Sequence, residues 1–300
     1  MSSHGPTDAD VTTTDGRTLR YQEAGDLHGH PVFLLHGMPG SRIGPRPRPG
    51  LLSRLGIRLI SYDRPGYGGS ERHARRTVAD CATDVTRIAD HLGLDGFAVA
   101  GRSGGGPHAL ACAALLPDRV NRAAVLVSFA PDEAGLDWYA GMNAANARDF
   151  SLAQADEEQL VETLRQQADR VRRRPMSLLE SLRDQVSVHD QRVVADATIE
   201  RLLLESYAEA TRPGPYGWID DALALRRPWG FDLTAISQRV LLWHGAEDNV
   251  VPASHARWLA QRIPSAELTV QSGSAHFGAM EILPSILSWL TQDPEARAAG

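Results

Sequence analysis

The chain has 300 residues, of which 42% are hydrophobic, so it can form one large domain, or a core with an insertion. Its net charge of -6 gives the surface no electrostatic reason to attract nucleic acid or an anionic membrane. All 31 basic residues are arginine, which excludes mechanisms that need a Schiff-base lysine or a phosphate-binding Walker lysine. The two cysteines, Cys81 and Cys112, lack metal-like spacing and are expected to be buried thiols.

The first ten residues lack the charged and apolar regions of a secretory leader. No apolar run approaches the ~20 residues of a membrane span. We therefore expect a soluble, cytoplasmic protein that binds neither nucleic acid nor a membrane. The sequence does not indicate an oligomeric state.

Over the first 130 residues, short apolar runs alternate with helix-like stretches. An alternating segment around Asp15-Gly16 predicts a β-hairpin. Buried strands are predicted at 31–37, 57–63, 96–101 and 122–128, with helices at about 47–55, 77–93 and 104–116. This alternation predicts a parallel sheet covered by helices on both faces.

The alternation then stops, and no convincing strand follows until the final quarter of the chain. Amphipathic helices are predicted within this middle part, at 155–174 and 193–210. A buried strand returns at 239–245, followed by a helix from Ala253, a strand near 266–272 and a closing helix from Glu281. We predict an α/β core, residues 1–130 and 230–300, interrupted by a helical cap, residues 131–229.

One serine stands in a pattern typical of a nucleophile. In "FAVAGRSGGGPHAL" (97–110), Ser103 lies between a strand pattern and a helix that begins near Pro107. The spacing fits G-x-S-x-G, in which a strand turns sharply into a helix and exposes the serine hydroxyl. We expect a positive φ at Ser103, and glycines at 101 and 105 that let strand and helix approach closely. The alternative is an ordinary serine in a glycine-rich turn.

A nucleophilic serine needs a base, and the base needs a group that holds its tautomer. His276 is the candidate base, in a loop of small residues after the last predicted strand. Asp248 is the candidate acid because it directly follows a buried strand, and Asp132 is the alternative acid. His108 is a rival base, but its position on the following helix favours a packing role.

The oxyanion formed in acyl transfer needs hydrogen-bond donors that are already in place. The motif "HGMPG" (36–40) follows a predicted core strand and offers the N–H of Met38. The N–H of Gly104, directly after the serine, is the second candidate donor. The alternative for "HGMPG" is an ordinary turn at the end of a strand.

The predicted cap is rich in large apolar side chains, which favour an apolar or aromatic substrate group. The candidate substrate-binding residues are Trp138, Tyr139, Met142, Trp218 and, beside the predicted base, Phe277. The alternative is that most of these side chains, with Trp229 and Phe231, pack the cap against the core.

Five motifs together resemble the α/β-hydrolase superfamily, in particular members with a helical cap. They are "HGMPG", "DRPGYGGS" (63–70), "GRSGG", "HGAEDNVVP" and "GSAHFG". The resemblance implies Ser103 as nucleophile, Asp248 as acid and His276 as base, with Met38 and Gly104 as oxyanion donors. The serine differs from the aspartate nucleophile of related epoxide hydrolases and haloalkane dehalogenases. Proline iminopeptidases usually carry a glycine and a tryptophan where this chain has Met38 and Gly104.

The sequence therefore predicts a serine hydrolase that cleaves a small carboxylic ester or lactone without a metal or organic cofactor. Amide cleavage, as in proline iminopeptidases, is an alternative because Asp220 and Asp221 could anchor a substrate amine; such a pair more often caps a helix. A further alternative is a ligand-binding member of the fold that has lost catalysis. Cap geometry, which the sequence does not reveal, sets the substrate.

Overall fold

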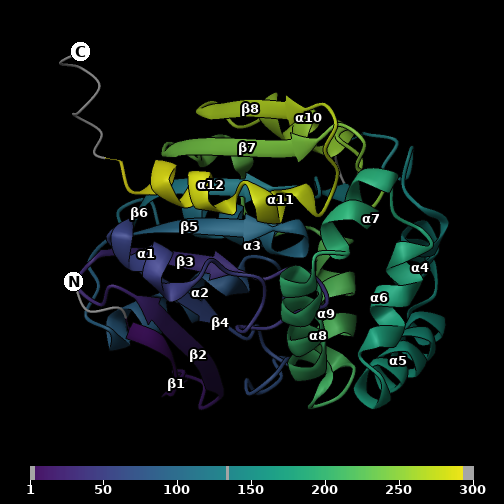
Figure 1. Cartoon of the computed structure of the whole chain (residues 1–300), viewed down its shortest axis with the longest axis horizontal. Helices are drawn as coiled ribbons and strands as arrows, with labels where there is room; N and C mark the ends of the chain where they lie inside the picture. Colours follow the sequence, from purple (N-terminus) through teal and green to yellow (C-terminus); the bar gives the residue numbers. More distant parts are fainter. Residues whose placement is uncertain (1–3, 133–134, 293–300) are drawn as a thin grey trace.

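An eight-stranded sheet forms the centre of the computed structural model, which describes residues 4–132 and 135–292 (Figure 1). The strands are β1 (His4–Thr12), β2 (Thr18–Gly25), β3 (His30–Leu35), β4 (Ile57–Tyr62), β5 (Phe97–Arg102), β6 (Val120–Leu126), β7 (Arg239–Gly245) and β8 (Ala266–Gln271). Their order in space is β1-β2-β4-β3-β5-β6-β7-β8. The β1–β2 and β2–β4 pairs are antiparallel, and the pairs from β4 to β8 are parallel. The predicted fold class, a mostly parallel sheet flanked by helices, is confirmed.

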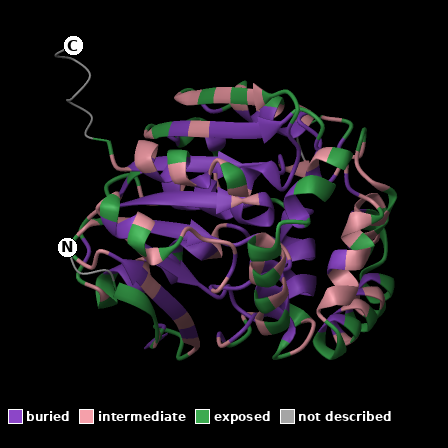
Figure 2. Ribbon diagram, in the orientation of Figure 1, coloured by how far each residue is buried: buried purple, intermediate pink, exposed green. Residues whose placement is uncertain are grey.

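Helices cover both faces of this sheet. They are α1 (Pro49–Arg54), α2 (Asp80–His91), α3 (Gly106–Leu115), α10 (Ser254–Ala260), α11 (Gly278–Glu281) and α12 (Leu283–Leu290). Successive side chains of a strand point to opposite faces, so in β3 Val32 and Leu34 pack in one hydrophobic cluster with α1 and α12. Phe33 and Leu35 pack in the other, with α2, α3 and α10. This double burial explains the near-continuous apolar strands, which Figure 2 shows as buried.

Six more helices lie between β6 and β7, beyond the ends of the parallel strands (Figure 1). They are α4 (Ala144–Ala155), α5 (Glu157–Arg173), α6 (Met176–Arg183), α7 (Val188–Val194), α8 (Ala197–Thr211) and α9 (Tyr216–Leu225). Residues 131–229 are called the cap below, and their division from the core stays a prediction. None of the helices in the described residues is long and apolar enough to cross a membrane.

Most predicted elements appear within a few residues of their expected bounds, and the hairpin around Asp15-Gly16 joins β1 to β2. Two differences have clear causes. β1 begins at His4, where pairing with β2 orders a polar segment that carries no strand pattern of its own. The helix expected over 193–210 is instead two helices, because the side chain of Asp196 accepts hydrogen bonds from the backbone N–H groups of Thr198 and Ile199 and caps α8.

A buried carboxylate joins the cap to the core. Asp221 of α9 accepts hydrogen bonds from Arg64 (2.5 Å), Arg76 (2.6 Å) and the Tyr67 hydroxyl (2.9 Å). Burial alone would raise the pKa of Asp221, but the two guanidiniums hold it below its usual value. The neighbouring Asp220 pairs with Arg72, which is half exposed. The expectation that this aspartate pair anchors a substrate or caps a helix is therefore wrong, because both side chains are held by arginines in the middle of α9.

We expect Asp221→Asn to lower the free energy of unfolding by about 3–5 kcal/mol, because it leaves two buried guanidiniums short of a counter-charge. The matched change Asp220→Asn should cost about 1 kcal/mol or less, because Arg72 can return to water. Urea unfolding of the two variants measures both values. Equal losses would contradict the central role of Asp221.

Candidate active site

Ser103 occupies a sharp turn between β5 and α3. Its φ is +55°, a conformation that side-chain-bearing residues rarely adopt. A Cβ at position 101 would lie 2.2 Å from the carbonyl oxygen of Gly105, and one at position 105 would lie 2.3 Å from that of Leu35. Only glycine fits these two positions. The local backbone therefore has the predicted form of a nucleophile elbow, with Ser103 at its tip.

The two residues predicted to serve as base and acid lie in direct contact. Nδ1 of His276 donates to Oδ2 of Asp248 across 2.9 Å. The other carboxylate oxygen of Asp248 accepts from the N–H groups of Val250 (2.8 Å) and Val251 (2.9 Å). Burial alone would raise the pKa of Asp248. The nearby His276 and the hydrogen bonds that the carboxylate accepts from His244 and His276 keep this pKa below its usual value. The carboxylate is thus fixed, ionised and aimed at the imidazole.

His244, expected to be structural, contributes to this arrangement. Its Nε2 lies 2.7 Å from the carbonyl oxygen of Val251 and 3.2 Å from Oδ2 of Asp248. The alternative acid Asp132 does not reach the site, because it forms an ion pair with Arg226 at 2.7 Å. The contacts therefore favour Asp248 over Asp132.

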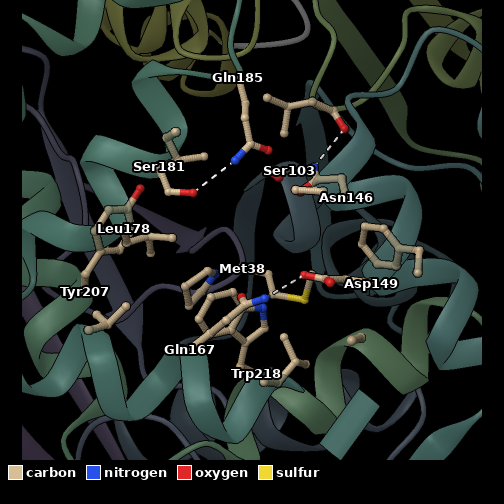
Figure 3. A pocket seen from close by; sticks show the side chains of 18 of the residues that line it. Met38, Ser103, Asn146, Asp149, Gln167, Leu178, Ser181, Gln185, Tyr207 and Trp218 are labelled. Atoms are coloured by element: carbon tan, nitrogen blue, oxygen red, sulfur yellow. Dashed lines mark hydrogen bonds between the residues drawn. The ribbon is translucent and has the colours of Figure 1, made fainter. Parts of the chain in front are cut away.

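A cavity of about 330 Å³ lies between the core and the cap, and both Ser103 and His276 line it (Figure 3). Its volume falls at the lower end of the range for small-molecule sites. Apolar lining residues are Met38, Phe129, Phe150, Leu164, Leu178, Trp218, Val250 and Phe277. Besides Ser103 and His276, the polar lining residues are Arg102, Asn146, Arg148, Asp149, Gln167, Arg170, Ser177, Ser181, Gln185 and Tyr207. In Figure 3, the labelled Gln185, Asn146 and Asp149 lie around the space that Ser103 borders.

The two backbone groups predicted as oxyanion donors are neighbours. A Cβ built on Gly104 would lie 2.9 Å from Cβ of Met38 and 3.5 Å from its backbone nitrogen. Arg64 fixes the loop that carries Met38, because it donates to the carbonyl oxygens of His36 and Gly37. Nδ1 of His108 lies 2.8 Å from the carbonyl oxygen of Gly104. Among the described residues, His108 forms no hydrogen bond with Ser103. This agrees with a packing role for His108.

Two of the predicted substrate-binding side chains, Trp218 and Phe277, line the cavity. Trp138, Tyr139 and Met142 do not, and for them the prediction is wrong. The Trp138 ring stacks on Phe129, and its N–H donates to the carbonyl oxygen of Ala130. Tyr139 packs against Trp138, and Met142 packs against the main hydrophobic cluster. These three side chains fasten the cap to the core instead.

No sequence motif marks Asp190, which lies in α7. Its carboxylate accepts from the backbone N–H groups of Phe277 (2.6 Å) and His276 (3.1 Å). Burial raises its pKa to about 6. Asp190 therefore holds the backbone of the predicted base from the cap side. Among residues 4–132 and 135–292, no group of three histidine, cysteine or acidic side chains is placed to hold a metal ion.

Comparison with known proteins identifies the family. The model of the α/β hydrolase fold family matches residues 30–281. A 2-hydroxymuconate semialdehyde hydrolase from Pseudomonas putida is 30% identical over 262 residues, 84% of this chain and 83% of that one. A proline iminopeptidase from Xanthomonas citri is 37% identical over 103 residues, 33% of each chain.

Solved structures share the fold. A bromoperoxidase from Bacillus anthracis has a TM-score of 0.70 at 20% identity, covering 96% of this chain and 100% of that one. A thermophilic esterase from Thermogutta terrifontis has a TM-score of 0.66 at 24% identity, covering 95% and 96%. The chain belongs to the α/β hydrolase fold family and is a hydrolase.

The buried imidazole of His108 should make stability depend on pH. Burial, with the nearby Arg64, lowers its pKa from 6.5 to about 3. Below pH 6.5 this imidazole therefore binds a proton in the unfolded chain but stays neutral in the folded protein. Its contribution to the free energy of unfolding is present at neutral pH and is lost on acidification. From pH 7 to pH 5 this one group should account for a loss of about 2 kcal/mol. Urea unfolding of His108→Gln should show a shallower decline over this range, and an unchanged decline would contradict the assignment.

Removing an acceptor at position 190 should disturb catalysis more than folding. Asp190→Asn keeps the shape but turns an amide N–H₂ toward a backbone N–H, so the loop of His276 should shift. We expect kcat to fall roughly tenfold with little change in KM, because a small misplacement of a catalytic group is costly. Asp184→Asn, an exposed cap carboxylate, is the control. A fall in melting temperature without a fall in kcat would argue against this role.

Proposed function

We propose that the protein is a serine hydrolase that cleaves a carboxylic ester or lactone through an acyl-enzyme. The observation that carries the proposal is the combination of Ser103 at positive φ with an Asp248–His276 pair on one cavity. A serine hydroxyl at the tip of an elbow is exposed to substrate, and a histidine oriented by a buried carboxylate is the base it needs. A plain turn serine would not need the strained backbone.

In the proposed mechanism, the Ser103 hydroxyl attacks the substrate carbonyl while Nε2 of His276 takes its proton. The N–H groups of Met38 and Gly104 receive the negative oxygen of the tetrahedral intermediate. His276 then returns the proton to the leaving alcohol, and a water repeats the sequence to release the acid. Asp248 keeps the Nδ1 proton in place and stabilises the imidazolium.

The cavity supports a small substrate with an apolar part. Trp218, Phe277 and Met38 supply apolar walls beside Ser103. A peptidase that recognises a free amino terminus would need an unpaired carboxylate near the serine. Asp220 and Asp221 do not offer one, since arginines hold both. Asp149 lines the cavity, but its carboxylate pairs with Arg148 and accepts from Gln167. Carbon–carbon bond cleavage, the reaction class of the Pseudomonas putida relative, is the second candidate because that similarity spans most of both chains.

Ser103→Ala should reduce ester turnover by at least about a thousandfold, because the remaining site supplies only binding and oxyanion contacts. The melting temperature should stay close to that of the unchanged protein, since alanine keeps the Cβ of Ser103 and the substitution removes only one hydroxyl group. When the reaction with p-nitrophenyl acetate is quenched during turnover, mass spectrometry of the protein should show an acetyl group on Ser103. Ser177→Ala, elsewhere on the cavity wall, is the control. Turnover that survives the loss of Ser103 would refute the mechanism.

A substrate panel should separate the candidate reactions. We expect kcat/KM for p-nitrophenyl esters of short acids and for lactones to exceed that for prolyl and alanyl anilides by at least about a hundredfold, because the aspartates at and near the cavity already pair with arginines. A 2-hydroxy-6-oxo-dienoate tests carbon–carbon cleavage in the same assay. Efficient anilide hydrolysis would favour the peptidase, and no reaction with any of these would favour a ligand-binding member of the fold.

A further inference from the structure

Arg102, the residue before Ser103 at the end of β5, lines the same cavity as Ser103 and His276. Its guanidinium lies beside residues 36–40, which carry the predicted oxyanion donor Met38, and beside the loop that carries His276. Nη2 would be 3.2 Å from a Cβ at position 37, and Cζ is 5.8 Å from the centre of the Phe277 ring. Nη1 is buried and has no hydrogen-bond partner among the described residues. A cation with an unused hydrogen-bond donor therefore lies next to the predicted nucleophile.

Arg102 is partly buried, and three fully buried arginines differ from it because each pairs with a carboxylate. Arg42 pairs with Asp8, Asp63 and Glu209, all within 2.7 Å. Arg64 and Arg76 share Asp221. Leaving a buried guanidinium without a partner is costly, so proteins normally supply one. Arg102 faces the cavity, where a bound ligand can supply the missing hydrogen-bond partner.

The charged groups nearest Arg102 are already occupied. Burial lowers the pKa of Arg102, and Asp190 and Asp248 oppose this shift through space, but neither lies within ion-pair distance of 4.0 Å in the described residues. The Asp190 oxygens accept from the N–H groups of His276 and Phe277. The Asp248 oxygens accept from His276, Val250 and Val251. These carboxylates moderate the cost of burying Arg102 without using its donors.

Tyr207 of α8 provides a second donor from the cap side. Its ring is buried, and it lines the cavity together with Arg102. Burial raises the pKa of its hydroxyl to about 12 even though Arg102 opposes the shift, so the hydroxyl keeps its proton. The two side chains also border a side cavity of about 30 Å³, next to Pro39. Both side chains therefore offer hydrogen-bond donors to the same cavity.

We infer that Arg102 and Tyr207 bind a free carboxylate of the substrate, so that the preferred substrates are esters or lactones that carry a second, ionised carboxyl group. This inference rests on the proposed function and names its substrate class. A guanidinium presents parallel N–H donors that match the two oxygens of a carboxylate. The carboxylate belongs either to the acyl part or to the alcohol part of the ester, and the experiment distinguishes the two.

Matched substrates that differ by one charge test the inference. The acyl arm compares mono-p-nitrophenyl glutarate with p-nitrophenyl valerate, and the alcohol arm compares 4-carboxyphenyl butyrate with phenyl butyrate. In at least one arm, the unchanged protein should give a higher kcat/KM for the anionic ester. Arg102→Gln should reduce the anionic-to-neutral ratio by about 10- to 100-fold, as expected for losing charge-assisted hydrogen bonds. The loss should lie mainly in KM.

Variants separate this role from a structural one. Arg102→Lys, which keeps the charge but not the planar fork, should give an intermediate ratio, and Tyr207→Phe should lower the ratio less than Arg102→Gln. Arg201→Gln, which removes an exposed arginine of α8 that does not line the cavity, should leave the ratio within about twofold, because an exposed charge is screened. An equal loss on both esters of a pair, or no anionic preference in either arm, would overturn the inference.

A binding measurement keeps the inference independent of catalysis. Calorimetry with Ser103→Ala compares monomethyl glutarate with dimethyl glutarate, which differ by one negative charge. The monoanion should bind at least about tenfold more tightly, and the additional change Arg102→Gln should remove the difference. If the protein hydrolyses no ester but shows this difference, the proposed reaction fails and the carboxylate site stands. If it hydrolyses neutral esters and shows no difference, the reaction stands and the site fails.

Discussion

The buried contact between Arg64 and Asp221 is the constraint on which the geometry of the site depends. On one side, Arg64 donates to the carbonyl oxygens of His36 and Gly37, directly before Met38. On the other, it pairs with a carboxylate in the middle of α9. One side chain therefore fixes both the loop that carries Met38 and the helix that contributes Trp218 to the cavity wall. The charges are sealed from water, so neither partner can leave without exposing the other.

The sequence predicts those parts of the molecule that depend on local pattern. Apolar runs with β-branched residues locate the strands because the parallel sheet is buried on both faces. The G-x-S-x-G spacing locates the strained turn because Gly101 and Gly105 are required by close backbone contacts within that segment. The contact of His276 with Asp248 follows from the adjacency of β7 and β8, which places the loops after them at one edge of the sheet.

Contacts between the cap and the core are beyond such reasoning, because they join segments far apart in the chain. Asp190 meets the backbone of His276 across 86 positions, and no local pattern marks it. In the sequence, nothing distinguishes Asp221 from other acidic residues of a helix. Only the structure shows that it pairs with Arg64 and Arg76. The aromatic residues of the cap show the same limit, since Trp138 and Trp218 are alike in sequence context but only Trp218 faces the cavity. Which face of a cap helix meets the core decides these outcomes.

The contact of Asp190 with the backbone of His276 and Phe277 couples two parts of the protein that otherwise have separate tasks. The carboxylate belongs to α7, which is part of the cap, whereas the histidine belongs to the core. When α7 is displaced, the two N–H groups lose their acceptors, and the imidazole loses part of its support at the same moment. The position of the His276 backbone therefore depends on where α7 lies, and not on the core strands alone. The loop after β8 takes its final shape only when the cap helix is packed against it.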